Sequence, residues 1–397
     1  MRFELAPLLL LVSKTKIIAF LFATPIELNL REMNIKNGSF RLFMSFLILT
    51  VCFGSQKANA QKLLKVAVVG LSHDHAHEIM NAFREQRIEL LGVAENDPKL
   101  IARYKRDYKV PDTLFYPDIE TMLGKFTPDV VMAYNPIDEH LAVAEICLPM
   151  KIPLVVEKPL ATTLKDAKRM AQLSRENNTH LLTNFETTWY PSNQKLKTLV
   201  DEADFGKITK MIAKDGHEGP KEIGCSQEFL AWLTDPIKNG GGAVMDFGCY
   251  GANLMTWLQN GKRPIAVTAV TKSMKPKVYP DVDDDATIIL EYENAIGIIE
   301  ASWNWSYSIK SLEVYGANSS YQAPNGKILS KNTSSSESEE MSLTSDYFKN
   351  HIEYIEALLS GDIKVNDDLS SLSNNLIVVE ILEAAKKSAE TGSRIQL

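Results

Sequence analysis

Apolar runs alternate with amphipathic segments between residues 63 and 185, and this alternation is the strongest constraint on the fold. The runs read KVAVVG, ELLGVAE, DVVMAY, PLVVEK and HLLTNF. They are rich in Val, Ile and Leu without polar alternation, as expected of strands that are buried on both faces. The segments between them, such as LKDAKRMAQLSREN, have helical periodicity. A strand–helix–strand repeat of this kind predicts a doubly wound parallel sheet.

A different pattern follows residue 205. Longer runs of alternating hydrophobicity predict an antiparallel, open sheet: ITKMIAKDG, IAVTAVTKS, ATIILEYEN, AIGIIEASWNW and KSLEVYG. One helix is predicted over residues 243–259, and two more close the chain. The polar segment SKNTSSSESEEM, residues 330–341, predicts a surface loop. The fold class is therefore α/β, with a parallel N-terminal sheet and a C-terminal α+β domain built on a large, mainly antiparallel sheet.

Length and charge limit the class of protein. The chain has 397 residues, which is enough for two ordinary domains, and a formal net charge of −7. This charge gives no reason to expect nucleic acid or an anionic membrane as a partner. We expect a protein that acts on or binds a small molecule.

The first 60 residues are predicted to be separate from the fold. From Met33 the chain reads MNIKNGSFRLFMSFLILTVCFGSQKANAQK, with a basic start, a short apolar core and the small-x-small site Ala58-Asn59-Ala60. This is the pattern of a secretory signal peptide, which is too short to span a bilayer comfortably. We therefore expect residues 1–32 to be a misassigned start, cleavage after Ala60, and a periplasmic or secreted protein that is free of the membrane.

The loop after the first predicted strand has the position of a dinucleotide-binding loop. The fingerprint G-x-G-x-x-G is represented by Gly70, Ser72 and His75. Gly70 permits the tight turn from strand to helix, and Ser72 partly replaces the second glycine. Glu95 ends the second strand about 20 residues further on, where an acid binds the adenosine ribose hydroxyls. A carboxylate repels a 2′-phosphate, so the sequence favours NAD over NADP.

The same loop carries His73, His75 and His77, and a metal site is the alternative interpretation. Such a site needs further ligands from other strand ends. The later strands end instead in Asn135, Lys158 and Asn184, a poor ligand set, so we expect no metal. The role of the three histidines stays open at this point.

Three motifs further along the chain resemble one protein family. They are NPIDEH followed by EKPLA, the glycine run 240–242 followed by Asp246 and Tyr250, and the C-terminal AAKKSAETGSRIQL. Together they resemble the glucose–fructose oxidoreductase and inositol dehydrogenase family (Gfo/Idh/MocA) over residues 64–397. The resemblance implies an NAD-binding Rossmann domain over residues 61–185 and a domain for substrate and oligomerisation over 186–397, with the last helices able to pack back on the first domain. It also implies a set of residues close to NAD: Gly70, Leu71, Ser72, His73, Glu95, Asn135, Pro136, His140, Glu157 and Lys158.

The chemistry of the expected catalytic residues can be argued directly. Hydride leaves a carbinol carbon as a base removes the hydroxyl proton, and Tyr250 or Asp246 can take that proton. Lys158 can hold the substrate oxygen and stabilise its developing negative charge. Asp246 and Tyr250 are four residues apart on a predicted helix, so both are expected to face one cleft.

One departure from the family affects the expected substrate contacts. Many members have an arginine three residues before the proline of the stretch FETTWYPS, where this chain has Thr188. Trp189 and Tyr190 follow it, and stacking on a sugar ring becomes plausible. His217, in KDGHEGP, is a further candidate for substrate contact. Trp303 and Trp305, two apart in a predicted strand, are expected to share one face and serve packing.

Three functions from different classes remain open. The first is an exported, homo-oligomeric, NAD-dependent oxidoreductase acting on a hydroxyl or carbonyl of a sugar or polyol. The second is a redox-neutral glycoside hydrolase or lyase of the same family, which oxidises a sugar transiently and reduces the product on the same NAD. The third is a sugar- or nucleotide-binding protein without catalysis. The identity of the sugar and the carbon oxidised do not follow from the sequence.

Overall fold

The computed structural model describes residues 10–12, 16–21, 24–29, 63–332, 339–340, 348–364 and 368–397. The chain divides into two units, Met1–Lys62 and Leu63–Leu397. In the first unit, β1 (Leu10–Val12), β2 (Lys16–Leu21) and β3 (Thr24–Asn29) form a small antiparallel sheet. The segment predicted as a signal peptide, residues 33–60, lies outside the described residues.

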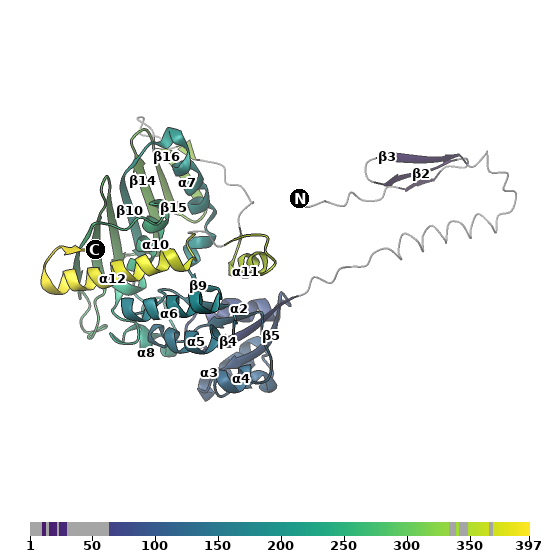
Figure 1. Cartoon of the computed structure of the whole chain (residues 1–397), viewed down its shortest axis with the longest axis horizontal. Coiled ribbons are helices and arrows are strands. Elements are labelled where there is room, and N and C mark those ends of the chain that lie inside the picture. The colour runs from purple at the N-terminus through teal and green to yellow at the C-terminus, as the bar shows by residue number, and fades with distance from the viewer. Residues whose placement is uncertain are drawn as a thin grey trace. The chain divides into compact units, whose positions relative to one another are not determined.

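The second unit begins with a six-stranded parallel sheet in the order β6-β5-β4-β7-β8-β9 (Figure 1). Chain order reverses between β4 and β7, and ligands bind outside the carboxyl ends of the strands at such a switch point. The five apolar runs form five of these strands, and α2–α6 connect or flank the six. The bounds are β4 (Leu64–Val69), α2 (Ala76–Arg84), β5 (Ile88–Ala94), α3 (Pro98–Tyr108), β6 (Phe115–Tyr116), α4 (Ile119–Leu123), β7 (Val130–Ala133), α5 (His140–Cys147), β8 (Leu154–Glu157), α6 (Leu164–Asn177) and β9 (Leu181–Asn184).

A nine-stranded sheet follows, in the order β17-β16-β15-β14-β10-β13-β12-β11-β18. All neighbouring pairs are antiparallel except β10 and β13, which run parallel. Buried and exposed residues alternate along strands such as β12, which indicates that only one face of the sheet is covered. The bounds are β10 (Ile208–Gly216), β11 (Ala266–Lys272), β12 (Asp285–Glu291), β13 (Ile296–Ser302), β14 (Ile309–Gly316), β15 (Ser320–Asn325), β16 (Ile328–Asn332), β17 (Glu339–Glu340) and β18 (Ile395–Gln396).

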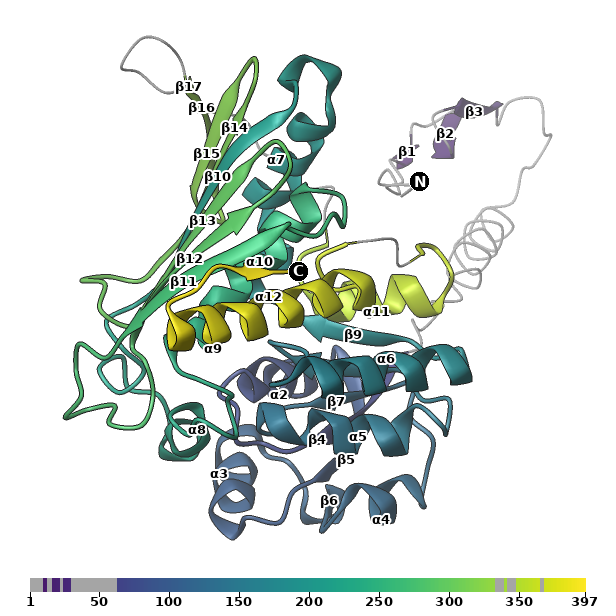
Figure 2. The same cartoon turned by 60° about the vertical axis from the view of Figure 1, so that its left-hand side comes forward.

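Helix α12 (Leu372–Thr391) lies between the large sheet and the first domain (Figure 2). It contacts β11 on one side and α6 on the other. Next to it, α10 (Gly248–Leu258) packs closely on the sheet, because a Cβ at Gly251 would lie 2.6 Å from a side-chain carbon of Ile299. The other helices are η3 (Glu186–Trp189), α7 (Pro191–Asp201), α8 (Gln227–Leu233), α9 (Ala243–Asp246) and α11 (His351–Leu359). Among the described residues, no helix combines the length and apolar character needed to cross a membrane.

Helix α8 makes some of the contacts between the two domains of this unit. The Asp74 carboxylate accepts a 3.0 Å hydrogen bond from the backbone N–H of Ser226, the residue that caps α8. Arg103 of α3 forms an ion pair with Glu228 of α8. These bonds hold α8 against α3 and against the loop that follows β4.

Two sequence-based predictions of secondary structure were wrong. The helix predicted over residues 243–259 is broken at Phe247, so Asp246 ends α9 and Tyr250 lies in α10. The backbone carbonyl of Asp246 accepts hydrogen bonds from the Lys158 ammonium and the Cys249 thiol, which replace the contacts of a continuous helix. The strand predicted through Trp305 ends at Ser302, where the chain turns away from the sheet.

The predicted polar loop, residues 330–341, lies mostly outside the described residues. Its described parts are the end of β16 and the two residues of β17, which pair with each other. The strand β16 therefore extends into the segment that was predicted as loop.

Candidate active site

The loop after β4 forms the cradle expected for a dinucleotide. Gly70 has φ of +73°, and a Cβ there would lie 2.8 Å from the Cβ of Asn135. Glycine is therefore required for the close approach of this loop to the end of β7. Within the described chain, Ser72 Oγ, Asn135 Oδ1 and the Tyr134 hydroxyl are buried without a hydrogen-bond partner. Buried polar atoms rarely stay unpaired, so this cradle fits a polar ligand such as the pyrophosphate and ribose of NAD.

Glu95 follows β5 and braces the same loop. One carboxylate oxygen accepts a 2.9 Å hydrogen bond from the Leu71 N–H, and the other accepts 2.8 Å hydrogen bonds from the Asn96 and Asp97 N–H groups. Burial raises the pKa of Glu95, and these backbone donors oppose the shift. A carboxylate has further lone pairs, so Glu95 can still accept hydrogen bonds from ribose hydroxyls.

His73, His75 and Glu157 lie together at the carboxyl ends of β4 and β8. Their ligand atoms lie within 4.8 Å of one another, which is compatible in distance with a metal ion. However, His73 Nδ1 accepts a 3.0 Å hydrogen bond from the His75 N–H, so the proton of a neutral His73 ring is on Nε2. It is Nε2 that faces Glu157, at 3.8 Å. The donor set therefore does not fit a metal, because the facing nitrogen has no free lone pair.

The cluster fits an ion pair instead. His75 Nδ1 lies 2.9 Å from one Glu157 oxygen, and Asn184 Nδ2 donates to the other at 2.9 Å. Burial disfavours charge on both groups, but their mutual attraction outweighs it, so the pKa of His75 is raised and that of Glu157 is lowered. His73 is buried against Phe229 and Trp232 of α8, and burial lowers its pKa. The histidines thus hold Glu157 in place.

The remaining predicted residues of the first domain have structural contacts. His77 hydrogen-bonds Tyr108. His140 is buried, and its Nδ1 lies 3.1 Å from the Leu160 carbonyl, so it orients the loop after β8. Pro136 precedes the short helical turn at residues 137–139.

Lys158 and Asp246 form a buried ion pair across the two domains. Lys158 Nζ donates to Asp246 Oδ1 at 2.5 Å and to the Asp246 carbonyl at 3.0 Å, which leaves a third N–H for another acceptor. Trp303 Nε1 donates to Asp246 Oδ2 at 2.9 Å. Burial disfavours both charges, but their attraction outweighs it: the pKa of Lys158 is raised and that of Asp246 is lowered. The pair therefore stays ionised.

Tyr250 lies between two ammonium groups. The centre of its ring is 5.0 Å from Lys158 Nζ and 5.1 Å from Lys310 Nζ, distances typical of cation–π contacts. Burial raises the pKa of its hydroxyl well above the ordinary value. Tyr250 is therefore a neutral hydroxyl, able to donate and accept a hydrogen bond at once.

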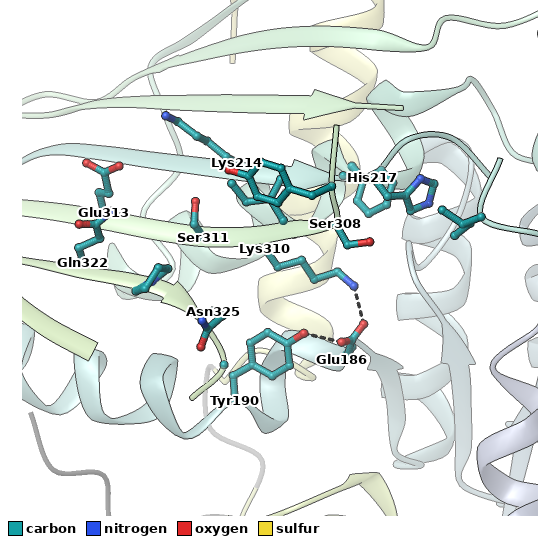
Figure 3. A pocket seen from close by; sticks show the side chains of 17 residues that line it. Glu186, Tyr190, Lys214, His217, Ser308, Lys310, Ser311, Glu313, Gln322 and Asn325 are labelled. Atoms are coloured by element: carbon teal, nitrogen blue, oxygen red, sulfur yellow. Dashed lines mark hydrogen bonds and ion pairs between the residues drawn. The ribbon is translucent and has the colours of Figure 1, made fainter. Parts of the chain in front are cut away.

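A cavity of about 830 Å³ opens beside this layer, on the large sheet (Figure 3). Its lining includes the predicted Tyr190 and His217, together with Phe247, Tyr307 and Lys310. The Gly219 N–H donates to His217 Nδ1 at 2.9 Å, so the neutral His217 ring carries its proton on Nε2 and serves as a hydrogen-bond donor. Burial lowers the pKa of His217, which favours this neutral form.

The predicted site residues do not all reach this cavity. Lys158, Asp246 and Tyr250 are 5%, 4% and 2% exposed and form a buried layer behind Phe247. Trp189 is not among the residues that line the cavity; its ring packs on Tyr354 of α11, and its Nε1 donates to Asn184.

Two contributors were missed in the sequence: Glu186 and Lys310. Glu186 of η3 pairs with Lys310 of β14 and accepts a hydrogen bond from the Tyr190 hydroxyl, as Figure 3 shows. Lys310, which is 124 residues from Glu186 in the sequence, contributes a cation to the cavity. The alternation of charged and apolar residues along KSLEVYG predicted a strand, but nothing local indicated this contact. Trp303 packs in the core as predicted, and its indole in addition donates a hydrogen bond to Asp246.

Taken together, the fold and site define a two-domain, dinucleotide-binding protein with a buried Lys–Asp pair beside a substrate-sized cavity. The family comparison agrees. Residues 64–185 match the oxidoreductase family with an NAD-binding Rossmann fold, and residues 193–322 match the GFO/IDH/MocA C-terminal domain. The chain belongs to the Gfo/Idh/MocA family, and its first domain is an NAD-binding Rossmann domain.

Individual relatives are distant. The trans-1,2-dihydrobenzene-1,2-diol dehydrogenase of Xenopus tropicalis is 25% identical over 206 residues, which are 51% of this chain and 57% of that protein. An inositol dehydrogenase homologue from Azotobacter vinelandii, solved with NAD⁺, superposes with a TM-score of 0.72 at 17% identity, over 85% of this chain and 98% of its own. Aldose–aldose oxidoreductase from Caulobacter crescentus, solved with glycerol, superposes with a TM-score of 0.69 at 20% identity. The match covers 84% of this chain and 100% of that chain. These structures show the same fold.

Proposed function

We propose that the protein is an NAD-dependent oxidoreductase that acts on a hydroxyl or carbonyl of a sugar or polyol. The observation that carries this proposal is the ionised Lys158–Asp246 pair, held at 2.5 Å between a dinucleotide cradle and the cavity. A purely binding protein has no need of a buried ion pair with one free N–H, because burying both charges is costly.

Each residue has a role that follows from its state. NAD, held by the loop at Gly70 and Ser72 and by Glu95, would supply the hydride acceptor or donor at the reacting carbon. A substrate oxygen that reaches the buried layer behind Phe247 would meet the remaining N–H of Lys158, which would stabilise negative charge there. Asp246, fixed by Trp303, keeps Lys158 charged and oriented. Tyr250 and His217 supply neutral hydrogen-bonding groups around the reacting carbon.

The cavity supports a neutral, hydroxyl-rich substrate. At the cavity Lys310 pairs with Glu186, while Lys214 lies 3.9 Å from Glu300, which is outside the lining. A phosphate or carboxylate of a substrate would have to compete with Glu186 for Lys310. Tyr307, 59% exposed at the cavity, offers an aromatic face of the kind that sugars stack on. The names of the relatives, a diol dehydrogenase and an aldose–aldose oxidoreductase, agree with this class.

A redox-neutral reaction on a glycoside is the second candidate. An exported enzyme has little free NAD to exchange, which favours recycling of the cofactor in place. Either one sugar is oxidised while another is reduced, or the same sugar is oxidised and reduced again around an elimination. The elimination needs a base beside the transient ketone. His73, His75 and His217 are the candidates, and of these His217 lines the cavity.

One incubation distinguishes these reactions. The enzyme is mixed in deuterated water with catalytic or stoichiometric NAD and a panel of free aldoses, polyols and 4-nitrophenyl glycosides. We expect a keto-sugar to accumulate with stoichiometric NADH. Free sugar with deuterium beside the oxidised carbon, and no net NADH, would establish the redox-neutral route instead. Sugar binding without turnover of any compound would contradict both and favour a binding protein.

We also propose that the protein is exported and forms homo-oligomers. Export is supported by the sequence of residues 33–60 alone. Assembly is supported by exposed apolar side chains on the open face of the large sheet: Val270, Ile289 and Ile296 are 56%, 41% and 44% exposed. Native mass spectrometry of the secreted protein is expected to show an oligomer, with a mass that is a multiple of the chain mass. The chain mass is expected to be that of residues 61–397. An intact Met33 would contradict export, and a monomer would contradict assembly.

A further inference from the structure

A buried carboxyl at the end of β10, that of Asp215, has no role in the proposed hydride transfer. Asp215 is 1% exposed, and within the described residues neither of its oxygens has a hydrogen-bond partner. Met211 and Ala213, which precede it on the same face of the strand, belong to the hydrophobic core. A buried carboxyl without partners is costly, so its presence calls for a functional explanation.

The neighbours of Asp215 leave no cation free to balance it. Lys310 is its register partner on β14, but the Lys310 ammonium pairs with Glu186. Lys158, the other cation whose charge acts on Asp215, pairs with Asp246. An ionised Asp215 would therefore add an uncompensated charge to a buried layer, which strongly favours the protonated form.

Other groups facing the same space do not change this balance. Tyr190 and the Cys249 thiol interact electrostatically with Asp215, and burial keeps both neutral by raising their pKa values. Burial raises the pKa of Asp215 to about 8; Lys310 and Lys158 oppose the shift, and Glu186 reinforces it.

The other candidates for proton transfer are committed to one form. Lys158 and Asp246 hold each other ionised, and the Tyr250 hydroxyl is too weak an acid to stay deprotonated. His217 carries its proton on Nε2 and uses Nδ1 to bind the Gly219 N–H. A group that exchanges protons efficiently titrates near the working pH.

We propose that Asp215 is a positioning residue that stores the proton of the reaction and exchanges it with the substrate hydroxyl by way of Tyr250. Lys310 lies next to both residues, since it is the register partner of Asp215 and its Nζ is 5.1 Å from the centre of the Tyr250 ring. In the oxidation, the C–H bond breaks and the hydride passes to the oxidised nicotinamide. The O–H bond breaks as the carbonyl forms, and the proton ends on ionised Asp215. Reduction runs the same transfers in reverse.

This inference rests on the proposed function, so the first test is independent of activity. Asp215→Asn keeps the shape and removes the titration. Between the ordinary pKa of an aspartate and about 8, folded wild type holds a proton that the unfolded chain has released, so its stability falls as the pH rises. The melting temperature of Asp215→Asn minus that of wild type is therefore expected to increase from pH 5 to 8 and then level off. A difference that does not vary with pH would overturn the protonated state.

The second test measures turnover of whichever aldose or polyol reacts fastest in the panel above. For wild type, oxidation is expected to rise and reduction to fall as the pH passes through 8. Asp215→Asn is expected to lose this dependence and to react about 100-fold more slowly, the usual scale of acid–base assistance. Asp204→Asn, at an exposed aspartate, is the matched control. An unchanged rate and pH profile in Asp215→Asn would overturn the role of Asp215 in proton exchange. If no compound reacts with wild type, the proposed function alone is contradicted.

Discussion

Replacement of Lys158 by Met is expected to reduce turnover at least about 1000-fold, because it removes the cation that stabilises charge on the substrate oxygen. Nucleotide binding is expected to change little, since the contacts of Gly70, Ser72 and Glu95 do not involve this ammonium. The same change leaves Asp246 buried and unpaired, which we expect to lower the free energy of unfolding by about 3–5 kcal/mol. Steady-state kinetics and denaturant unfolding measure the two effects separately.

A double variant separates catalysis from folding. Lys158→Met with Asp246→Asn removes both charges, so stability is expected to recover towards wild type while turnover stays lost. The Trp303 indole still has an oxygen to donate to if the amide oxygen takes that position. Turnover of Lys158→Met within tenfold of wild type would place the chemistry elsewhere. Recovery of activity in the double variant would show that the single variant failed only because it misfolded.

Glu95 is expected to decide between NAD and NADP. Glu95→Ala removes charge-assisted hydrogen bonds to the ribose, each of about 1.5–3 kcal/mol, so NAD affinity is expected to fall about 100-fold. Rejection of NADP is expected to relax, because the carboxylate no longer repels a 2′-phosphate. Calorimetric titration of both nucleotides measures the change in preference.

The bracing of the loop by Glu95 requires a second variant. Glu95→Gln retains an oxygen that can accept the Leu71 N–H, so it removes the charge with less disturbance of the loop. If loop position alone matters, Glu95→Gln will bind NAD as wild type does and Glu95→Ala will not. If charge selects the nucleotide, both variants will accept NADP better. Wild type that prefers NADP would make the ribose assignment wrong.

The first domain was predictable because its strands are buried on both faces. Such strands must be almost purely apolar, and the five runs from KVAVVG to HLLTNF correspond to β4, β5, β7, β8 and β9. The exception is β6, whose two residues are too short to give a periodic signal. The fold class and the family were confirmed by the structure and the matched family models.

The second domain was less predictable, because several of its strands depend on partners distant in sequence. β15 contains Pro324, and β18 has only two residues, which pair with β11 from more than 100 residues away. The break at Phe247 was missed for a related reason. At this break the Asp246 carbonyl accepts a hydrogen bond from Lys158, 88 residues earlier. No local pattern records such a contact.

The family motifs predicted the Lys158–Asp246–Tyr250 set, which the structure brings together. They did not predict the surroundings that set its charge states. One signal was present but unused: Asp215 continues the buried face of Met211 and Ala213, where a carboxyl is rare. Lys310 and Glu186 gave no comparable signal, since each is an ordinary residue of a half-exposed segment.

The contacts around α8 have a consequence for recombination between relatives. A chimera that joined the first domain of this chain to the second domain of another member would retain Lys158, and the family motif would supply a matching acid. It would not necessarily retain the α8 interface, which is formed by Asp74 with Ser226 and by Arg103 with Glu228. The α8 interface holds Phe229 of α8 against His73. We therefore expect its loss to shift the dinucleotide loop relative to the Lys158–Asp246 pair. A chimera of this chain is therefore expected to be more active when α8 is transplanted together with the first domain.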